Sequence, residues 1–120
     1  PLKNSYWIIG GRMQHGYDIY ENIYRISKRE LNIELQRDKC KLLTVMNYIW
    51  GMREQSPKTN GTTDISLTFH YKLSKDEFKS FKLDENEYDH ESFIWTSYED
   101  MSNKNFHEAI NIFSNILKRQ

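Results

Sequence analysis

Two adjacent glycines followed by an arginine are the first residues in this sequence that could do chemistry. Gly10, Gly11 and Arg12 end a short aromatic and β-branched run at residues 5–9, and a helical pattern follows them. A turn between a strand and a helix presents free backbone N–H and C=O groups. Together with a guanidinium, these groups can bind a phosphate or a metal ion. Paired glycines are also typical of a tight turn without a ligand, so the spacing alone leaves both interpretations open.

A histidine in an acidic loop is the second candidate. His90 lies among Glu87, Asp89 and Glu91. These carboxylates would stabilise the protonated imidazole, yet the ring can still accept a proton near neutral pH, as a general base must. A solvated polar loop without a catalytic role is the alternative interpretation.

Charged residues after the glycines form the third candidate. Arg25 and Glu30 lie five residues apart, and Lys28, Arg29 and Glu30 are consecutive. On most helices such a cluster is simply a solvated face.

The hydrophobic pattern predicts the elements that position these residues. Ile19, Ile23 and Ile26 fall at helical spacing, and Asp18 is suited to the N-cap. Ile65, Leu67 and Phe69 alternate with polar residues, which indicates a half-buried antiparallel strand. We expect strands at 5–9, 42–50, 62–73 and 92–95, helices at 18–31, 75–81 and 106–117, and a loop at 51–61. His70 and His107 are expected at the surface. The result is an α+β domain around a largely antiparallel sheet.

Composition narrows the class of protein. The 120 residues, 38% of them hydrophobic, suffice for a single folded domain. Lys and Arg total 17 and so do Asp and Glu, so no net charge draws the chain to nucleic acid or to an anionic membrane. Cys40 is the single cysteine and is expected to pack in the interior. We find no signal peptide or apolar run long enough to span a bilayer, and we expect a cytoplasmic protein.

The segment from residue 10 to 33 resembles the signature of the Nudix hydrolases. That family has a strand ending in Gly-Gly, a loop, and a helix that carries Arg-Glu and, near its end, Glu-Glu-x-Gly. Here Arg25 and Glu30 occupy the Arg and the last Glu, whereas Tyr17, Ile26 and Arg29 stand at the other acidic positions. One carboxylate cannot hold a cluster of magnesium ions, because hard cations need several oxygen ligands. The resemblance therefore implies a Nudix-like α/β/α sandwich but disfavours attack at phosphorus.

The GDP-mannose mannosyl hydrolase branch keeps a depleted box of this kind, and the chain is similar to it over most of its length. The similar features are the Gly-Thr-Thr at 61–63, Ser-Lys-Asp-Glu-Phe at 74–78, and Asp-His-Glu-Ser-Phe-Ile-Trp at 89–95. By this resemblance His90 is the general base for water attacking the anomeric carbon of a nucleoside diphosphate-linked sugar.

The same resemblance implies the remaining site residues. One Mg²⁺ would be held by Glu30, the carbonyl of Gly10 and Asp89, which replaces the usual Gln. Arg12 would contact the diphosphate and offset charge on the leaving group, so that it serves in both binding and catalysis. Arg25 would bind substrate or orient a carboxylate.

Two other interpretations stay open. Tyr17 and Ile26 at acidic positions favour a non-catalytic Nudix-like module that binds a nucleotide or sugar phosphate. A re-registered helix with Glu21 and Glu30 as metal ligands would keep attack at phosphorus.

The resemblance also implies at least two further sheet strands before residue 5. We expect either a truncated chain or a second copy that supplies them, which makes a homodimer a candidate assembly.

Overall fold

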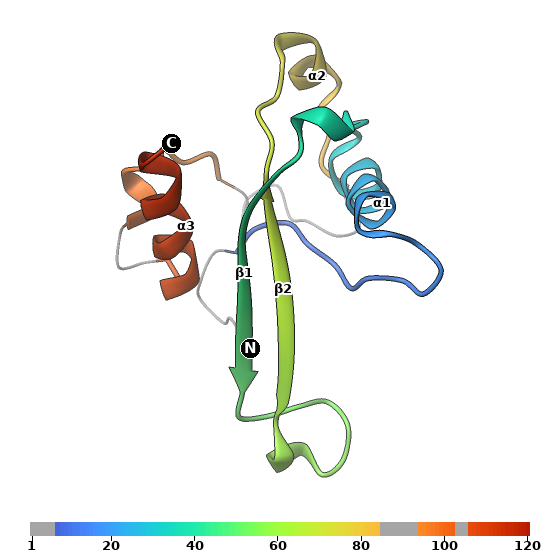
Figure 1. Cartoon of the computed structure of the whole chain (residues 1–120), viewed down its shortest axis with the longest axis vertical. Coiled ribbons are helices and arrows are strands. Elements are labelled where there is room, and N and C mark those ends of the chain that lie inside the picture. Colours follow the sequence, from blue (N-terminus) through green and yellow to red (C-terminus); the bar gives the residue numbers. More distant parts are fainter. Residues whose placement is uncertain (1–6, 85–93, 103–105) are drawn as a thin grey trace. The chain divides into compact units, whose positions relative to one another are not determined.

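The computed structural model describes residues 7–84, 94–102 and 106–120. The chain divides into two compact units (Figure 1). One unit comprises Lys41–His70, and the other comprises Pro1–Cys40 with Tyr71–Gln120. Within the described residues the elements are two strands, three α-helices and three 3₁₀ turns, an α+β composition as predicted. None of the helices within the described ranges is long and apolar enough to cross a bilayer.

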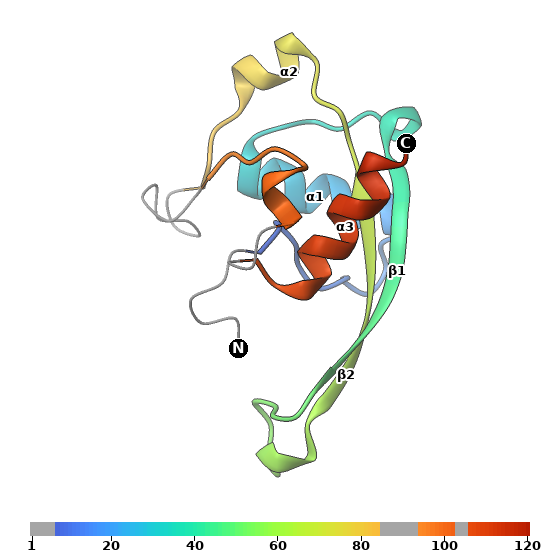
Figure 2. The ribbon, with the colours of Figure 1, turned by 90° about the vertical axis from the view of Figure 1, so that its left-hand side faces the viewer.

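The unit at 41–70 is a β-hairpin. β1 (Lys41–Trp50) and β2 (Thr62–His70) pair antiparallel in the register Asn47 to Ile65 and Trp50 to Thr62. The two strands form a long twisted ribbon in Figure 2, as strands of L-residues do. Their connection contains the 3₁₀ turn η2 (Lys58–Asn60). The strand predicted at 42–50 and the loop at 51–61 are therefore confirmed.

The second strand departs from its prediction in two ways. β2 ends at His70, three residues before the expected end. Ile65 is 74% exposed, whereas Thr68 on the supposed polar face is buried. The expected half-burial of Ile65 is wrong because a two-stranded ribbon has no layer within its own unit to cover that face.

The helix after the glycines is confirmed almost to the residue. α1 spans Ile19–Leu31, and the Asp18 side chain caps it by accepting from the backbone N–H of Glu21 (2.8 Å). Asn32 ends it in the left-handed conformation with φ 56°, which Asn tolerates better than most residues. Ile33, the next residue, is fully buried and anchors the end of the helix.

The two shorter helices are also confirmed. α2 (Lys75–Ser80) begins with the predicted capping box, in which Ser74 and Glu77 each satisfy the other's backbone N–H. α3 (Glu108–Lys118) buries Ala109, Ile110 and Phe113 along one stripe. The remaining 3₁₀ turns are η1 (Arg37–Lys39) and η3 (Asp100–Ser102).

His107 is not the plain surface residue that the sequence predicted. Its Nδ1 accepts from the backbone N–H of Ala109 (3.1 Å) and so caps α3. Trp7 meets its ring edge-on, with the centroids 5.3 Å apart. The imidazole therefore has a structural role at the start of this helix.

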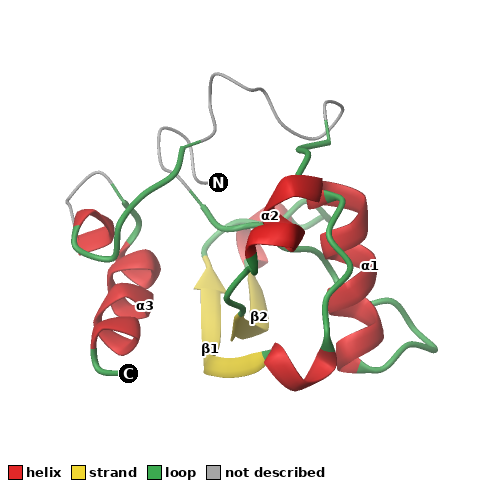
Figure 3. Ribbon diagram, turned by 90° about the horizontal axis from the view of Figure 1, so that it is seen from above, coloured by secondary structure: helices red, strands yellow, loops and turns green. Residues whose placement is uncertain are grey.

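Two predicted strands do not form in the described residues. Residues 7–9 and 94–95 are loop and not strand, so both expectations are wrong there, while residues 5–6 and 92–93 lie outside the described residues. In the described part of the chain the sheet consists of β1 paired with β2 (Figure 3). An aromatic, β-branched run becomes a strand only when a neighbour satisfies its backbone groups. The Nudix sandwich consequently remains a prediction.

Candidate functional site

The glycine loop, which we define as Gly10, Gly11 and Arg12, lies against α1. A methyl group added at Gly11 would come within 3.2 Å of Ile26 Cδ1 and 3.5 Å of Arg29 Nη2. The backbone carbonyl of Arg12 accepts from Arg25 Nη2 (3.0 Å). The predicted turn at Gly10 and Gly11 does not form, since the turn of this segment is at residues 15–16, but the structure brings the glycine loop next to Arg25 and Arg29. All of them lie within one unit.

Asn22 fixes the segment between the glycine loop and the helix. This side chain is 2% exposed, and its Oδ1 accepts from the backbone N–H of Gln14 (2.8 Å). Its Nδ2 donates to the carbonyls of Asp18 (2.9 Å) and Tyr17 (3.3 Å). The sequence analysis missed this residue. Its position three residues before Arg25, on the same helix face, was the available signal.

Arg25 positions the loop through its backbone. Its Nη2 binds the Arg12 carbonyl and also lies 3.2 Å from Asn22 Oδ1. Its Nε is buried and donates to no hydrogen-bond acceptor within the described ranges. The contacts that the structure gives this guanidinium are with a carbonyl and an amide, where we had expected a substrate or a carboxylate. The Arg12 residue itself is exposed.

Glu30 is the buried carboxylate of the site. Its side chain is 4% exposed, and Arg29 Nη2 lies 3.2 Å from its Oε1. The Arg29 side chain is 44% exposed. Burying a carboxylate is costly unless a partner compensates for the lost water. The charge of Glu30 is therefore balanced by the guanidinium that also faces Gly11.

The described residues do not by themselves fit a magnesium site. Of the three predicted ligands, Gly10 and Glu30 are described, while Asp89 lies outside the described residues. Oε1 of Glu30 already faces a guanidinium, and a second cation on the same oxygen would meet a like charge. In the part of the chain that the structure describes, no three His, Cys, Asp or Glu side chains group as metal ligands. The predicted Mg²⁺ stays a prediction that depends on Asp89.

The predicted general base, His90, belongs to the acidic loop with Glu87, Asp89 and Glu91. His90 lies outside the described residues, as does the acidic loop around it. The position of its imidazole relative to the glycine loop remains an expectation from the sequence.

The re-registered helix is not supported. Glu21 lies in the first turn of α1 and Glu30 at its end. Nine residues of α-helix separate them by about 13 Å along the axis. Nine residues at about 100° each also place the two side chains on opposite faces of the helix, so these two carboxylates cannot share one Mg²⁺, whose ligands each lie about 2 Å from the ion.

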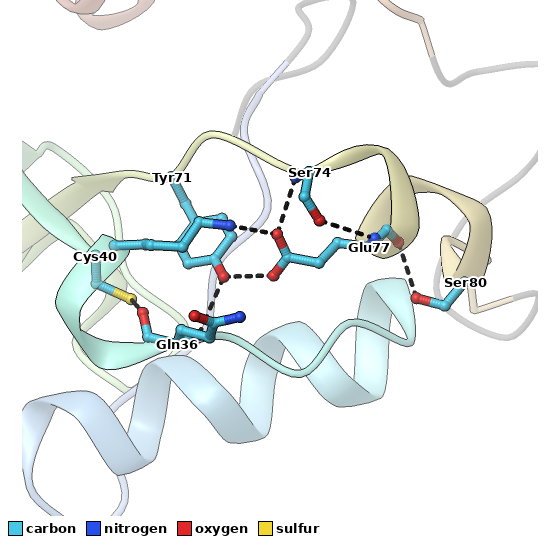
Figure 4. A network of polar contacts seen from close by, with 7 residues as sticks. Gln36, Cys40, Tyr71, Ser74, Glu77 and Ser80 are labelled. Atoms are coloured by element: carbon cyan, nitrogen blue, oxygen red, sulfur yellow. Dashed lines mark hydrogen bonds and ion pairs between the residues drawn. The ribbon is translucent and has the colours of Figure 1, made fainter.

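A second polar network joins η1 to α2 (Figure 4). The Glu77 carboxylate accepts from Lys39 Nζ (2.5 Å) and Tyr71 Oη (2.5 Å), and from the backbone N–H of Ser74 (2.9 Å). Tyr71 Oη in turn accepts from the backbone N–H of Gln36 (3.0 Å). Each polar group here is satisfied by another, which is typical of a structural contact.

Electrostatics in this network favour the ionised carboxylate. The Lys39 ammonium, with Tyr71 and Ser74, lowers the pKa of Glu77 to about 2. The hydrogen bond to Glu77 raises the pKa of Lys39. Burial, followed by the contact with Glu77, raises the pKa of Tyr71. These pKa shifts hold all three groups in their ordinary charge states at neutral pH. The network is therefore suited to stabilising the fold and poorly suited to transferring a proton.

Cys40 packs next to this network, as expected. It is buried, and its thiol donates to the backbone carbonyl of Gln36 (3.5 Å). Burial raises the pKa of the Cys40 thiol, which disfavours the reactive thiolate.

An open depression of about 340 Å³ lies beside α2. Its lining residues are Lys28, Asn32, Glu34, Asp76, Glu77 and Ser80. The carboxylates in this lining disfavour an anionic ligand, so the glycine loop is the better candidate for phosphate.

Comparison with protein-family models and with curated proteins gave no match. The Nudix resemblance therefore rests on the sequence residues quoted above and stays a prediction.

Proposed function

We propose that this chain is a Nudix-like hydrolase of nucleoside diphosphate-linked sugars. The glycine loop and the adjoining face of α1 bind the diphosphate, and His90 serves as the general base. The observation that supports this most is that Arg25 and Arg29 of α1 lie against the backbone of the glycine loop. Guanidiniums are the side chains that best recognise phosphate oxygens.

The reaction is displacement at the anomeric carbon. Water attacks that carbon, a new C–O bond forms, and the bond from the sugar to the diphosphate oxygen breaks. The water proton goes to the His90 imidazole, and the electron pair of the broken bond leaves with the diphosphate. Arginines near the leaving group stabilise the charge that develops on it. Arg12, exposed in the glycine loop, is the residue we assign to this role.

A non-catalytic binding module is the second candidate, and one contact favours it. Arg29 stands where the family signature has an acid, and it is paired with the single surviving carboxylate, Glu30. A site with this pair can still bind an anion through the guanidinium, but it lacks the cluster of acidic residues in the family signature. Binding without turnover would be the outcome.

A panel of nucleoside diphosphate sugars tests both proposals. Each is incubated with the protein with and without Mg²⁺, and the released sugar and nucleotide are quantified. Free sugar with nucleoside diphosphate supports the hydrolase, whereas sugar phosphate with nucleoside monophosphate contradicts attack at carbon. A nucleotide sugar that raises Tm without any product over hours supports the binding module.

His90→Ala identifies the base within the same assay. We expect kcat to fall by roughly 100-fold or more while nucleotide affinity stays nearly unchanged. His70→Gln, a histidine change in the separate hairpin unit, is the matched control. Full activity of the His90 variant would remove this residue from the mechanism.

A further inference from the structure

Arg29 occupies a particular place between the glycine loop and Glu30. Its Nη2 lies 3.2 Å from the Glu30 carboxylate. The same nitrogen lies 3.5 Å from where a Cβ of Gly11 would be. A Cβ at position 11 would be in van der Waals contact with the guanidinium, so the loop backbone at Gly11 lies beside Arg29.

The Arg29 side chain is much more exposed to solvent than the Glu30 side chain. Glu30 is 4% exposed, but Arg29 is 44% exposed. A guanidinium carries five N–H donors, and within the described ranges Arg29 gives one hydrogen bond, to Glu30. The carboxylate holds the guanidinium through one nitrogen, and nearly half of the Arg29 side chain is accessible to solvent.

The local charge suits a diphosphate. Arg12 belongs to the glycine loop, Arg25 and Arg29 lie against it, and Glu30 pairs with Arg29. Two positive charges are left to meet an anion. A diphosphate carries about two to three negative charges, and guanidiniums bind phosphate oxygens in pairs of parallel hydrogen bonds.

We infer that the Arg29 guanidinium takes the place of the divalent cation at this site, so that the chain binds a nucleoside diphosphate without metal. The inference rests on the proposed function, because it assigns the diphosphate to the glycine loop. Arg29 supplies the positive charge, and Glu30 holds it in position. A metal ion would have to displace this guanidinium from the buried carboxylate first.

Calorimetric titration with GDP as the probe tests the inference on the whole chain. Affinity is measured in EDTA and again in excess Mg²⁺. We expect Kd in EDTA to lie within about threefold of Kd in Mg²⁺. Binding that is lost in EDTA and restored by Mg²⁺ would overturn the role of Arg29 but keep the proposed ligand. GDP binding in neither condition would overturn the proposed function together with the inference.

Variants at position 29 identify the group responsible. Arg29→Gln should weaken binding in EDTA by roughly tenfold or more, as the loss of a charge-assisted contact does, and Arg29→Lys should restore part of the affinity. Lys28→Gln removes the same charge one residue earlier from a side chain that is 55% exposed, and it should bind like the wild type. If Arg29→Gln also binds like the wild type, Arg29 is not the cation.

Folding is controlled by a paired variant. Removing Arg29 leaves Glu30 buried without its cation, which can unfold the protein. Arg29→Gln with Glu30→Gln removes both charges and should keep the fold while still losing GDP affinity in EDTA. Retained affinity in this folded double variant would overturn the inference.

Discussion

Gly61 lies directly before β2 in the connection of the β-hairpin. Its replacement by alanine should destabilise the hairpin. The residue has φ 70° and ψ −165°, a combination that is essentially restricted to glycine. A Cβ there would lie 2.2 Å from the backbone oxygen of Trp50. Because the contacted atom belongs to the end of β1 and not to a flexible side chain, the overlap can be relieved only by moving a strand.

The expected cost follows from these two facts. Holding a non-glycine residue in such a conformation costs about 1–3 kcal/mol, and the overlap with the carbonyl adds to it. The reduced entropy of the unfolded chain returns about 0.4–1 kcal/mol. A net loss of about 2 kcal/mol lowers Tm by roughly 6–10 °C in a chain of this size.

Gly51→Ala is the matched control, because nothing lies within 4 Å of a Cβ at that position. It should leave Tm unchanged or raise it slightly. Thermal melts followed by circular dichroism compare the two variants, and hydrogen exchange of the β1 and β2 amides locates the change in the hairpin. Equal melting temperatures for the two variants, or protected hairpin amides in Gly61→Ala, would refute the reasoning.

Two further predictions concern the network at α2 and the glycine loop. Because the pKa of Glu77 is lowered to about 2, the stability that its ionisation contributes is complete above about pH 4.5 and is lost as pH falls toward 2; Glu77→Gln should therefore melt below the wild type at pH 7, with a difference that shrinks on acidification. Asp76→Asn, at a side chain 95% exposed, should show no such trend, and a constant Glu77 difference across pH would contradict the assignment. Gly11→Ala must shift Ile26, 3.2 Å from the new Cβ, and should cost about 0.5–1.5 kcal/mol in chemical denaturation. Gly10→Ala meets nothing within 4 Å, and an equal loss in both variants would show that the loop does not rest on α1.

Local signals explain what the sequence predicted well. α1 was predictable because Asp18 and Asn32 mark its two ends by side-chain chemistry that acts within a few residues. The capping box at Ser74 and Glu77 is equally local. Helix boundaries of this kind need no knowledge of the tertiary fold.

The sequence predicted strand pairing and strand burial poorly, because both depend on residues that are distant in the chain. The run at residues 5–9 has the composition of a strand, but a strand also needs a partner that may come from anywhere in the chain. Ile65 has the period of a buried residue, yet its burial depends on a layer that the hairpin unit does not contain. In both cases the sequence pattern is compatible with a buried strand, but it does not show whether the neighbouring strand or layer is present.

Predictions for the candidate site also divide into those with a sequence signal and those without one. The glycine loop and Glu30 were predicted to converge, and the structure brings the loop against the residue next to Glu30. The hydrogen bonds of Asn22 and the network from Lys39 to Glu77 could not be predicted, because sequence spacing does not show which side chains a loop places together.

Arg29 changes the charge balance of the site more than the other departures from the family signature do. Replacing an expected acid by Tyr17 or Ile26 removes one negative charge, whereas an arginine at the third position also adds a positive one. A buried carboxylate needs a cation beside it, and a metal-binding relative meets that need with the metal itself. In this chain the Arg29 side chain already provides the cation next to Glu30. If Arg29 replaces the metal as we propose, the other acids are lost without a loss of anion binding, because a site that carries its own positive charge does not need a cluster of carboxylates to recruit one.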